Sequence, residues 1–202
     1  MNFHDYNAVK EHIIPVLKNA ALLSVSKKGL LYESIVNDII MCVRLSLTNK
    51  LYVTERLAAI WKIPKHEVFR QALENGKAYL QNCEPTMNSS KIIGEEVNLY
   101  ILYPRLLKEI LDVNNAYASQ YIIACPSSRM LLYGEATKER YFEIYRDSAS
   151  NSYQVQDMDV ISDFPMILKE DRIEAFQCED FDPRQMGFLI AWEDKTGVLH
   201  LG

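Results

Sequence analysis

The sequence predicts an α+β fold, with helices packed on an antiparallel or mixed β-sheet and a β-hairpin at the C-terminus. Segments whose apolar residues recur every three or four positions, as in helices, alternate with short strand-like segments. Several strand-like segments are paired across tight turns, and the regular strand–helix–strand order of a parallel α/β protein is missing. These observations favour a sheet built from hairpins and covered by helices.

The chain of 202 residues has room for one domain with a small appendage. We expect residues 1–176 to form a single α+β domain with an N-terminal helix. Residues 177–202 are expected to form a hairpin extension packed on the same domain. This expectation rests on the apolar stretches 188–192 and 198–201, which flank a turn that contains Gly197.

The first quarter of the chain predicts a helix followed by two strands. Residues 5–22 show helical spacing of apolar residues, with a kink expected at Pro15. The apolar run 35–47 alternates with polar residues in its second half, which indicates a strand with one buried face. A turn at 48–50 then returns the chain as a strand over 51–53.

Two helices and a loop are predicted next. Thr54 is a good N-cap for a short helix that ends near Trp61. Pro64 stands in the first turn of a second helix, which is expected to stop at Asn75-Gly76. The polar stretch 82–94 predicts a surface loop.

The second half of the chain predicts mainly strands. Pro104 opens a helix, and Thr137 caps another helix that extends to about Asp147. Short apolar segments predict strands over 97–102, 121–124, 130–133, 166–168 and 173–176.

The composition is that of an ordinary globular protein, with 49% hydrophobic and 24% charged residues. The net charge of −5 argues against direct binding of nucleic acid. No apolar run could span a membrane and the first residues show no secretory signal, so we expect a cytoplasmic protein. The four cysteines form no CxxC pair and the four histidines form no ligand motif, so no metal and no other cofactor is expected.

Acidic residues are concentrated in the second half of the chain. Residues 1–112 contain 14 Lys and Arg against 12 Asp and Glu, whereas residues 113–202 contain 8 against 15. The excess forms either a solvated face or a docking surface for a basic partner, and the 12 tyrosines add rings that interfaces favour. The residues that we expect to bind a partner are Asp157, Asp159, Asp163, Glu170, Asp171, Tyr141 and Tyr145.

No strong catalytic signature is present. The two candidate nucleophiles, Cys125 and Ser127, lie where a predicted strand ends, and functional side chains often occupy such positions. Either would need a base such as His66 or His200 nearby. The plainer interpretation is a Pro-Ser turn whose hydroxyls bond the backbone, and no GxSxG motif favours catalysis.

Three segments carry a resemblance by their order and spacing: 51–61 (LYVTERLAAIW) running on to 72–75, 102–108 (LYPRLLK), and 121–123 followed by 126–128. Over roughly residues 30–175 the chain resembles an uncharacterised bacterial family, domain of unknown function 5688. The unit at 51–75 is more faintly similar to domain of unknown function family 1444. A shortened N-terminal region and the 177–202 hairpin depart from the family pattern. The resemblance implies a cytosolic protein of a phage or mobile element, with no known activity or site residues.

Three functional hypotheses remain open. The first is a non-catalytic interaction protein that binds a basic host or defence protein, for example a nuclease whose basic groove an acidic, Tyr-rich surface could block. The second is a small hydrolase-like enzyme that uses Cys125 or Ser127. The third is a homo-oligomeric structural protein with the tail hairpin paired between chains.

Overall fold

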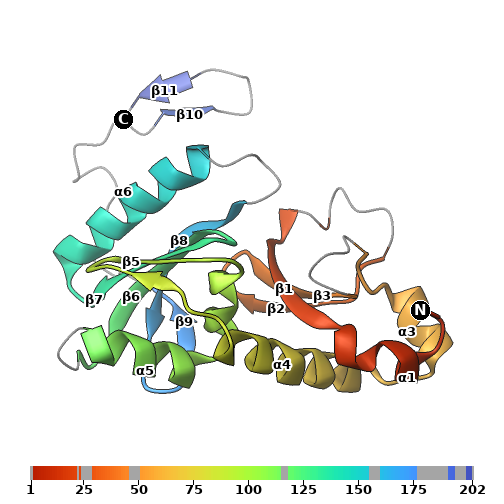
Figure 1. Ribbon diagram of the computed structural model, residues 1–202. Helices are drawn as coiled ribbons and strands as arrows, with labels where there is room; N and C mark the ends of the chain where they lie inside the picture. The colour runs from red at the N-terminus through yellow and green to blue at the C-terminus, as the bar shows by residue number, and fades with distance from the viewer. Residues whose placement is uncertain are drawn as a thin grey trace.

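The computed structural model describes residues 2–21, 23, 29–45, 51–114, 118–154, 160–176, 191–193 and 199–201. Helices and antiparallel sheets make up this part of the chain, so the predicted α+β class is confirmed. Figure 1 shows a smaller sheet next to a larger one, with helices on both faces of the larger sheet.

The smaller sheet has three antiparallel strands in the order β1-β3-β2, formed by Ile14–Asn19 (β1), Ile39–Arg44 (β3) and Tyr32–Val36 (β2). The prediction of one helix over residues 5–22 is wrong, because only α1 (Tyr6–Val9) and the 3-10 helix η1 (Lys10–His12) precede β1. The apolar residues after Ile13 pair with β3 instead and are buried there. Pro15 is tolerated because β1 is an edge strand.

A tight turn at Asn37 and Asp38 divides the apolar run that was predicted to hold one strand. Asn37 has a φ of 50°, which asparagine adopts more readily than most residues and which two-residue hairpins require. The predicted turn at 48–50 lies outside the described residues. The predicted return over 51–53 is confirmed by backbone hydrogen bonds from Leu45 N to Leu51 O (3.0 Å) and from Val53 N to Val43 O (2.8 Å).

Two helices follow, α3 (Glu55–Trp61) and α4 (Lys65–Gln81). Thr54 caps α3 as predicted, since its Oγ1 accepts a hydrogen bond from Leu57 N at 3.2 Å. The predicted stop of α4 at Asn75-Gly76 is wrong, because the helix continues through this position. Gly76 marks a close approach of other side chains to the helix rather than its end.

The larger sheet has six antiparallel strands in the order β4-β5-β7-β6-β8-β9. The strands predicted over 121–124, 130–133, 166–168 and 173–176 are present as β6 (Tyr121–Ser127), β7 (Met130–Glu135), β8 (Val160–Leu168) and β9 (Ile173–Ala175). Strand β6 ends three residues later than predicted, and β8 begins six residues earlier. The stretch predicted as a loop instead contains the hairpin β4 (Thr86–Met87) and β5 (Lys91–Ile93). The predicted strand over 97–102 is a buried 3-10 helix, η2 (Val97–Leu102). A continuous apolar run fits any fully buried element, so the periodicity of residues 97–102 could not distinguish a strand from a 3-10 helix.

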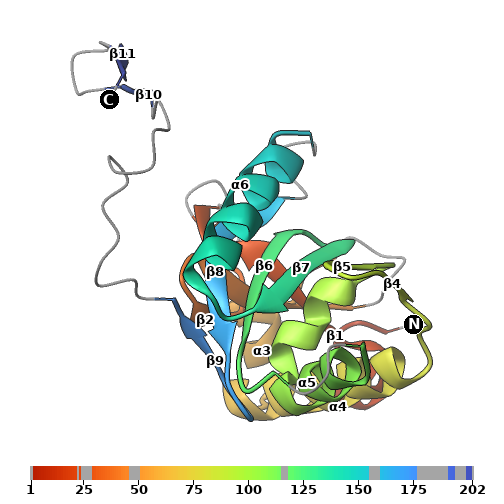
Figure 2. The same ribbon diagram turned by 90° about the vertical axis from the view of Figure 1, so that its left-hand side faces the viewer.

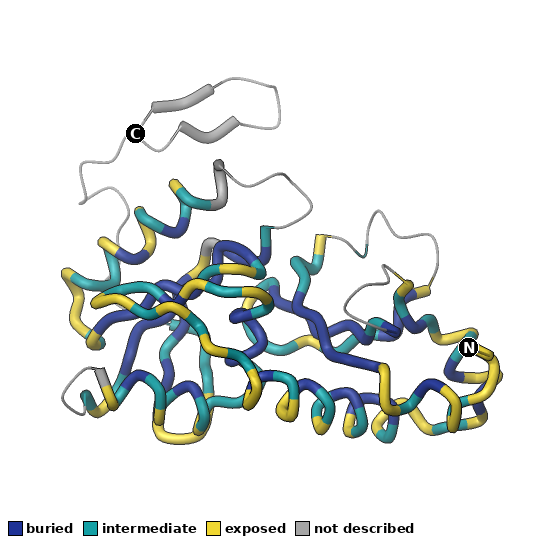
Figure 3. Tube along the Cα trace, viewed as in Figure 1, coloured by how far each residue is buried: buried dark blue, intermediate teal, exposed yellow. Residues whose placement is uncertain are grey.

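Helices cover both faces of the larger sheet. Ile122 and Ala124 pack with Ile144 of α6 (Lys138–Gln154) on one face, whereas Tyr121 and Ile123 belong to the main core on the other face. The other face carries η2 and α5 (Pro104–Asn114), whereas α4 packs on β1 of the smaller sheet and on η2. Figure 2 shows α6 and α5 on opposite sides of the sheet. In Figure 3 the strands between these helices are mostly buried, whereas the outer sides of the two helices are more exposed.

The predicted C-terminal hairpin is present as β10 (Ala191–Glu193) and β11 (Leu199–Leu201), which pair antiparallel with each other. Among the described strands neither pairs with either of the two larger sheets. The packing of the hairpin on the rest of the chain therefore stays a prediction. No helix in the described ranges has the length and apolar character needed to cross a membrane.

Candidate functional site

A groove lies between helix α5 and the turn that joins β8 to β9 (residues 169–172). It has a volume of about 290 Å³ and is lined by Arg105, Lys108, Glu109, Asp112, Glu170 and Asp171. We call this the α5 groove. Its lining contains four carboxylates and two basic groups, so its net charge is negative.

The helical repeat explains how α5 supplies four of these side chains. Residues 108 and 109 lie three and four positions after residue 105, and residue 112 lies four and three positions after them, so all four share one side of a helix. Leu107 and Leu111, on the other face, are fully buried in the main core. The burial of these two leucines therefore fixes which charged residues of α5 face the groove.

Two residues that line the α5 groove, Lys108 and Asp112, form a hydrogen-bonded group with the buried Tyr121. Lys108 Nζ lies 3.0 and 2.8 Å from the two carboxylate oxygens of Asp112, and the hydroxyl of Tyr121 donates a 2.8 Å hydrogen bond to Asp112 Oδ1. The Lys108 ammonium also lies 5.6 Å from the centre of the Tyr121 ring. These contacts hold Lys108 in place, so it is already engaged within the chain.

The same contacts lower the pKa of Asp112. Partial burial by itself raises the pKa of this carboxyl, but the hydrogen bonds from Lys108 and Tyr121 and the charge of Lys108 outweigh that effect. The pKa of Tyr121 is raised, first by burial and then by its hydrogen bond to Asp112. Asp112 is therefore ionised in the folded protein at neutral pH.

We expect Asp112 to stabilise the fold in a pH-dependent way. Because its folded pKa is below the unfolded value of about 3.9, its contribution is fully present above about pH 5 and is lost as the pH falls through the folded pKa. The difference in free energy of unfolding between wild type and Asp112→Asn should therefore shrink below about pH 4. Urea unfolding between pH 3 and pH 7 measures this difference. The variant Lys108→Met should reduce the pH dependence, and an unchanged profile in that variant would contradict the assignment.

The ion pair across the groove is held less firmly than the group of Lys108, Asp112 and Tyr121. Arg105 Nη2 and Asp171 Oδ2 form an ion pair at 3.2 Å between two largely exposed side chains, which joins α5 to the β8–β9 turn. Within the described part of the chain, no ion pair engages Glu109 or Glu170. Two carboxylates, one on each wall, are thus available to a ligand.

The predicted partner-binding residues do not form one surface. Glu170 and Asp171 are exposed in the β8–β9 turn and line the α5 groove. Tyr141 and Tyr145 lie on α6, which covers the opposite face of the sheet (Figure 2). Asp157 and Asp159 lie outside the described residues, as does the side chain of Asp163. The single acidic, Tyr-rich surface expected from the sequence is therefore divided between two faces of the sheet.

The tyrosines of α6 belong to a row of aromatic rings. The ring of Tyr141 stacks on that of Phe176 with centroids 4.5 Å apart and lies parallel to that of Tyr145 at 6.4 Å. Phe142 meets Tyr141 edge-on at 5.4 Å. Tyr141 and Phe176 also pack against the small core beneath α6, so this part of the row fixes α6 on the sheet.

The two candidate nucleophiles are both buried. Cys125 is fully buried in the main core, its thiol contacts Ser127 O at 3.5 Å, and burial raises the pKa of the thiol. Ser127 is 8% exposed, and its Oγ accepts a hydrogen bond from Arg129 N at 3.3 Å. A thiol that stays protonated and closed to solvent is a poor nucleophile, which argues against Cys125 in that role. The strand does not end at residue 124 as predicted, because β6 continues through Cys125 and Pro126 to Ser127 and the turn stands at Ser128 and Arg129. The Ser127 hydroxyl bonds the backbone of that turn, which is a structural role.

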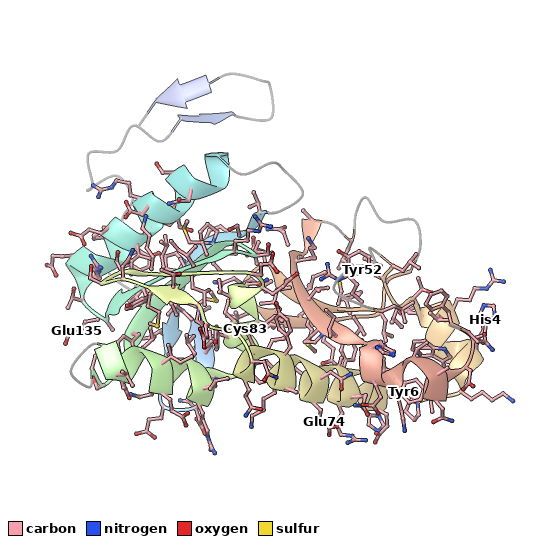
Figure 4. The ribbon with its side chains drawn as sticks, viewed as in Figure 1. His4, Tyr6, Tyr52, Glu74, Cys83 and Glu135 are labelled. Atoms are coloured by element: carbon pink, nitrogen blue, oxygen red, sulfur yellow. The ribbon has the colours of Figure 1, made fainter. Side chains whose placement is uncertain are left out.

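Of the two bases considered for these nucleophiles, the side chain of His200 lies outside the described residues, and His66 makes no contact with Cys125 or Ser127 among the described interactions. His66 stands at the exposed start of α4 beside Glu67, and His200 lies in β11. In the described ranges, no three His, Cys, Asp or Glu side chains come together in a way that could hold a metal ion. As an example of this separation, Figure 4 shows His4 at one end of the molecule and Cys83 near its middle.

Sequence reasoning missed the α5 wall of the groove. Charged residues on one face of a helix usually only solvate it, so Arg105, Lys108, Glu109 and Asp112 gave no distinctive signal. The facing turn is about 60 residues further along the chain, and only the tertiary structure brings it to α5.

Comparisons of this chain with protein-family models, with curated proteins and with solved structures found no match. The resemblance to the bacterial family of domain of unknown function 5688 therefore stays a prediction.

Proposed function

We propose that this protein is a non-catalytic interaction protein that binds a basic segment of a partner protein in the α5 groove. The observation that carries the proposal is the lining of this groove, where four carboxylates face two basic groups. A groove with an excess of one charge attracts partners of the opposite charge and favours their correct orientation. The burial of Cys125 and Ser127 supports a binding role over the hydrolase alternative.

The partner class follows from the charge distribution. The groove is negative, and the second half of the sequence adds 15 acidic against 8 basic residues. Proteins that bind nucleic acids carry basic surfaces and are natural partners for such a field. We therefore propose a basic nucleic-acid-binding protein as the partner. A host defence nuclease fits this class and the mobile-element context that the family resemblance implies.

Charge reversal on the two walls of the groove tests the proposal. The double variant Glu109→Lys, Glu170→Lys should weaken partner binding at least about tenfold, because it replaces two attractive charges by repulsive ones. The partner is captured from a bacterial lysate at low salt, and its affinity is then measured by titration with each purified variant. High salt should release it, since exposed charges are screened.

The matched control reverses the same number of charges at the other end of the molecule. Glu11 and Glu55 are exposed near η1 and α3, far from α5 in Figure 1. The double variant Glu11→Lys, Glu55→Lys should bind almost as wild type does. Equal loss in both double variants would show that only net charge matters, and full binding by the groove variant would exclude the groove. Reversal of Asp157, Asp159 and Asp163 to lysine tests the acidic stretch in the same assay.

A further inference from the structure

One of the residues that line the α5 groove, Arg105, bridges its two walls. The Arg105 guanidinium comes from α5, crosses to the opposite wall and pairs with Asp171 at 3.2 Å. No other ion pair among the described residues joins α5 to the β8–β9 turn. The pair is largely exposed, and exposed pairs contribute little to stability. Arg105 is therefore easily displaced.

The chemistry of the wall suits a guanidinium from another molecule. A guanidinium is planar, carries five N–H donors and binds carboxylates through two parallel hydrogen bonds. Glu170 is adjacent to Asp171, and Glu109 lies on the facing helix, so further carboxylate oxygens are close to the one that Arg105 occupies. The second base of the groove, Lys108, is held by Asp112 and Tyr121 and does not compete for these oxygens.

We propose that Arg105 is an autoinhibitory contact: its guanidinium occupies Asp171 in the free protein, and an arginine side chain of the partner displaces it. This inference rests on the proposed function and names the group of the partner that enters the groove. Free Arg105 then faces away from the occupied carboxylate or joins acidic groups of the partner. Binding is weaker than the groove would otherwise allow, and arginine is preferred over lysine.

The consequence is an arginine whose removal improves binding. Arg105→Gln should bind an arginine-rich peptide about two- to fivefold more tightly than wild type, which is the range set by the modest strength of an exposed pair. Arg172→Gln is the matched control. Arg172 lies in the same turn and carries the same charge, but it is paired with Glu174 at 2.7 Å. Arg172→Gln should increase the affinity for the peptide only by the smaller amount that comes from the change in net charge.

The experiment uses the full chain and two fluorescent peptides of equal charge, hexa-arginine and hexa-lysine, titrated by fluorescence anisotropy at low salt. We expect the affinity to rise more in Arg105→Gln than in Arg172→Gln, and to rise more for hexa-arginine than for hexa-lysine. In an Asp171→Asn background, Arg105→Gln should no longer change the affinity for the peptides. Equal gains in the two glutamine variants would overturn the autoinhibitory role and leave the proposed function standing. Failure of every variant to bind either peptide would overturn the proposed function itself.

Discussion

Replacement of Asp38 by alanine is expected to lower the free energy of unfolding by about 2–4 kcal/mol, because it takes the acceptor away from the buried Ser162 hydroxyl and from the half-buried Asn19 amide. Asp38 lies in the β2–β3 turn. It accepts a 2.6 Å hydrogen bond from the side chain of Asn19 in β1 and another from the hydroxyl of Ser162 in β8. Ser162 is fully buried, and Asn19 also donates to Ile161 O at 3.0 Å. One carboxylate thus joins the smaller sheet to the larger one.

Urea unfolding of two comparison variants tests this role. Ser34→Ala changes an exposed side chain on the same hairpin and should alter stability by less than about 0.5 kcal/mol. In a Ser162→Ala background, the effect of Asp38→Ala should shrink by about 1 kcal/mol or more, since one of the two donors is already gone. If Asp38→Ala lowers the free energy of unfolding no more than Ser34→Ala does, the carboxylate does not join the sheets.

Replacement of Gly76 by alanine is expected to destabilise the protein by about 1–3 kcal/mol, although alanine is the better helix former. A Cβ atom at this position would lie 2.6 Å from Pro15 Cγ and 2.6 Å from the Tyr103 hydroxyl. Neither neighbour can move freely. Pro15 is held in β1, and the Tyr103 hydroxyl donates a 2.6 Å hydrogen bond to Leu73 O. The added methyl group must therefore push α4 away from both.

Gly134→Ala is the matched control for this overpacking. A Cβ atom at Gly134 would meet the side chain of Arg140, which is long and can swing aside at the cost of its partly exposed ion pair with Glu143 and its 3.5 Å contact with Tyr133 O. Its effect on the urea midpoint should be clearly smaller than that of Gly76→Ala. Equal midpoints for the two variants would show that the contacts of Gly76 are not tight. Because α4 packs on η1 and β1, the crystal structure of the Gly76 variant should show a shift of this helix against the smaller sheet.

The α5 groove shows why a site can be invisible in a sequence. Glu170 and Asp171 were expected to bind a partner because acidic residues are concentrated around them. The negative charge of this region is partly balanced in the structure. Arg105 pairs with Asp171, and both Lys169 and Arg172 pair with the nearby Glu174. What distinguishes the site is the pairing of this turn with α5, and no local pattern indicates that pairing. Tyr141 and Tyr145 were grouped with it by composition, yet they lie on the other face of the sheet.

The local chemistry of the sequence determined the elements whose signals are local. Thr54 and Thr137 cap helices because a threonine hydroxyl can accept a hydrogen bond from the backbone three residues on, and both do so here. Pro104 opens α5 because its fixed φ suits a first helical turn. The strands β6 and β7 follow from short apolar segments on either side of a tight turn.

Only the tertiary structure decided the elements that depend on distant neighbours. Residues 14–19 can form either a helix or a strand, and pairing with β3 selects the strand. The apolar run 97–102 becomes a 3-10 helix because it is enclosed between the sheet and the helices α4 and α5. At Gly76 a local stop signal is overridden, because α4 continues to Gln81 and buries Leu80 in the core, and the glycine leaves room for Pro15 and Tyr103. In each case the free energy of packing against residues far away in the chain exceeds the small preference of the local sequence.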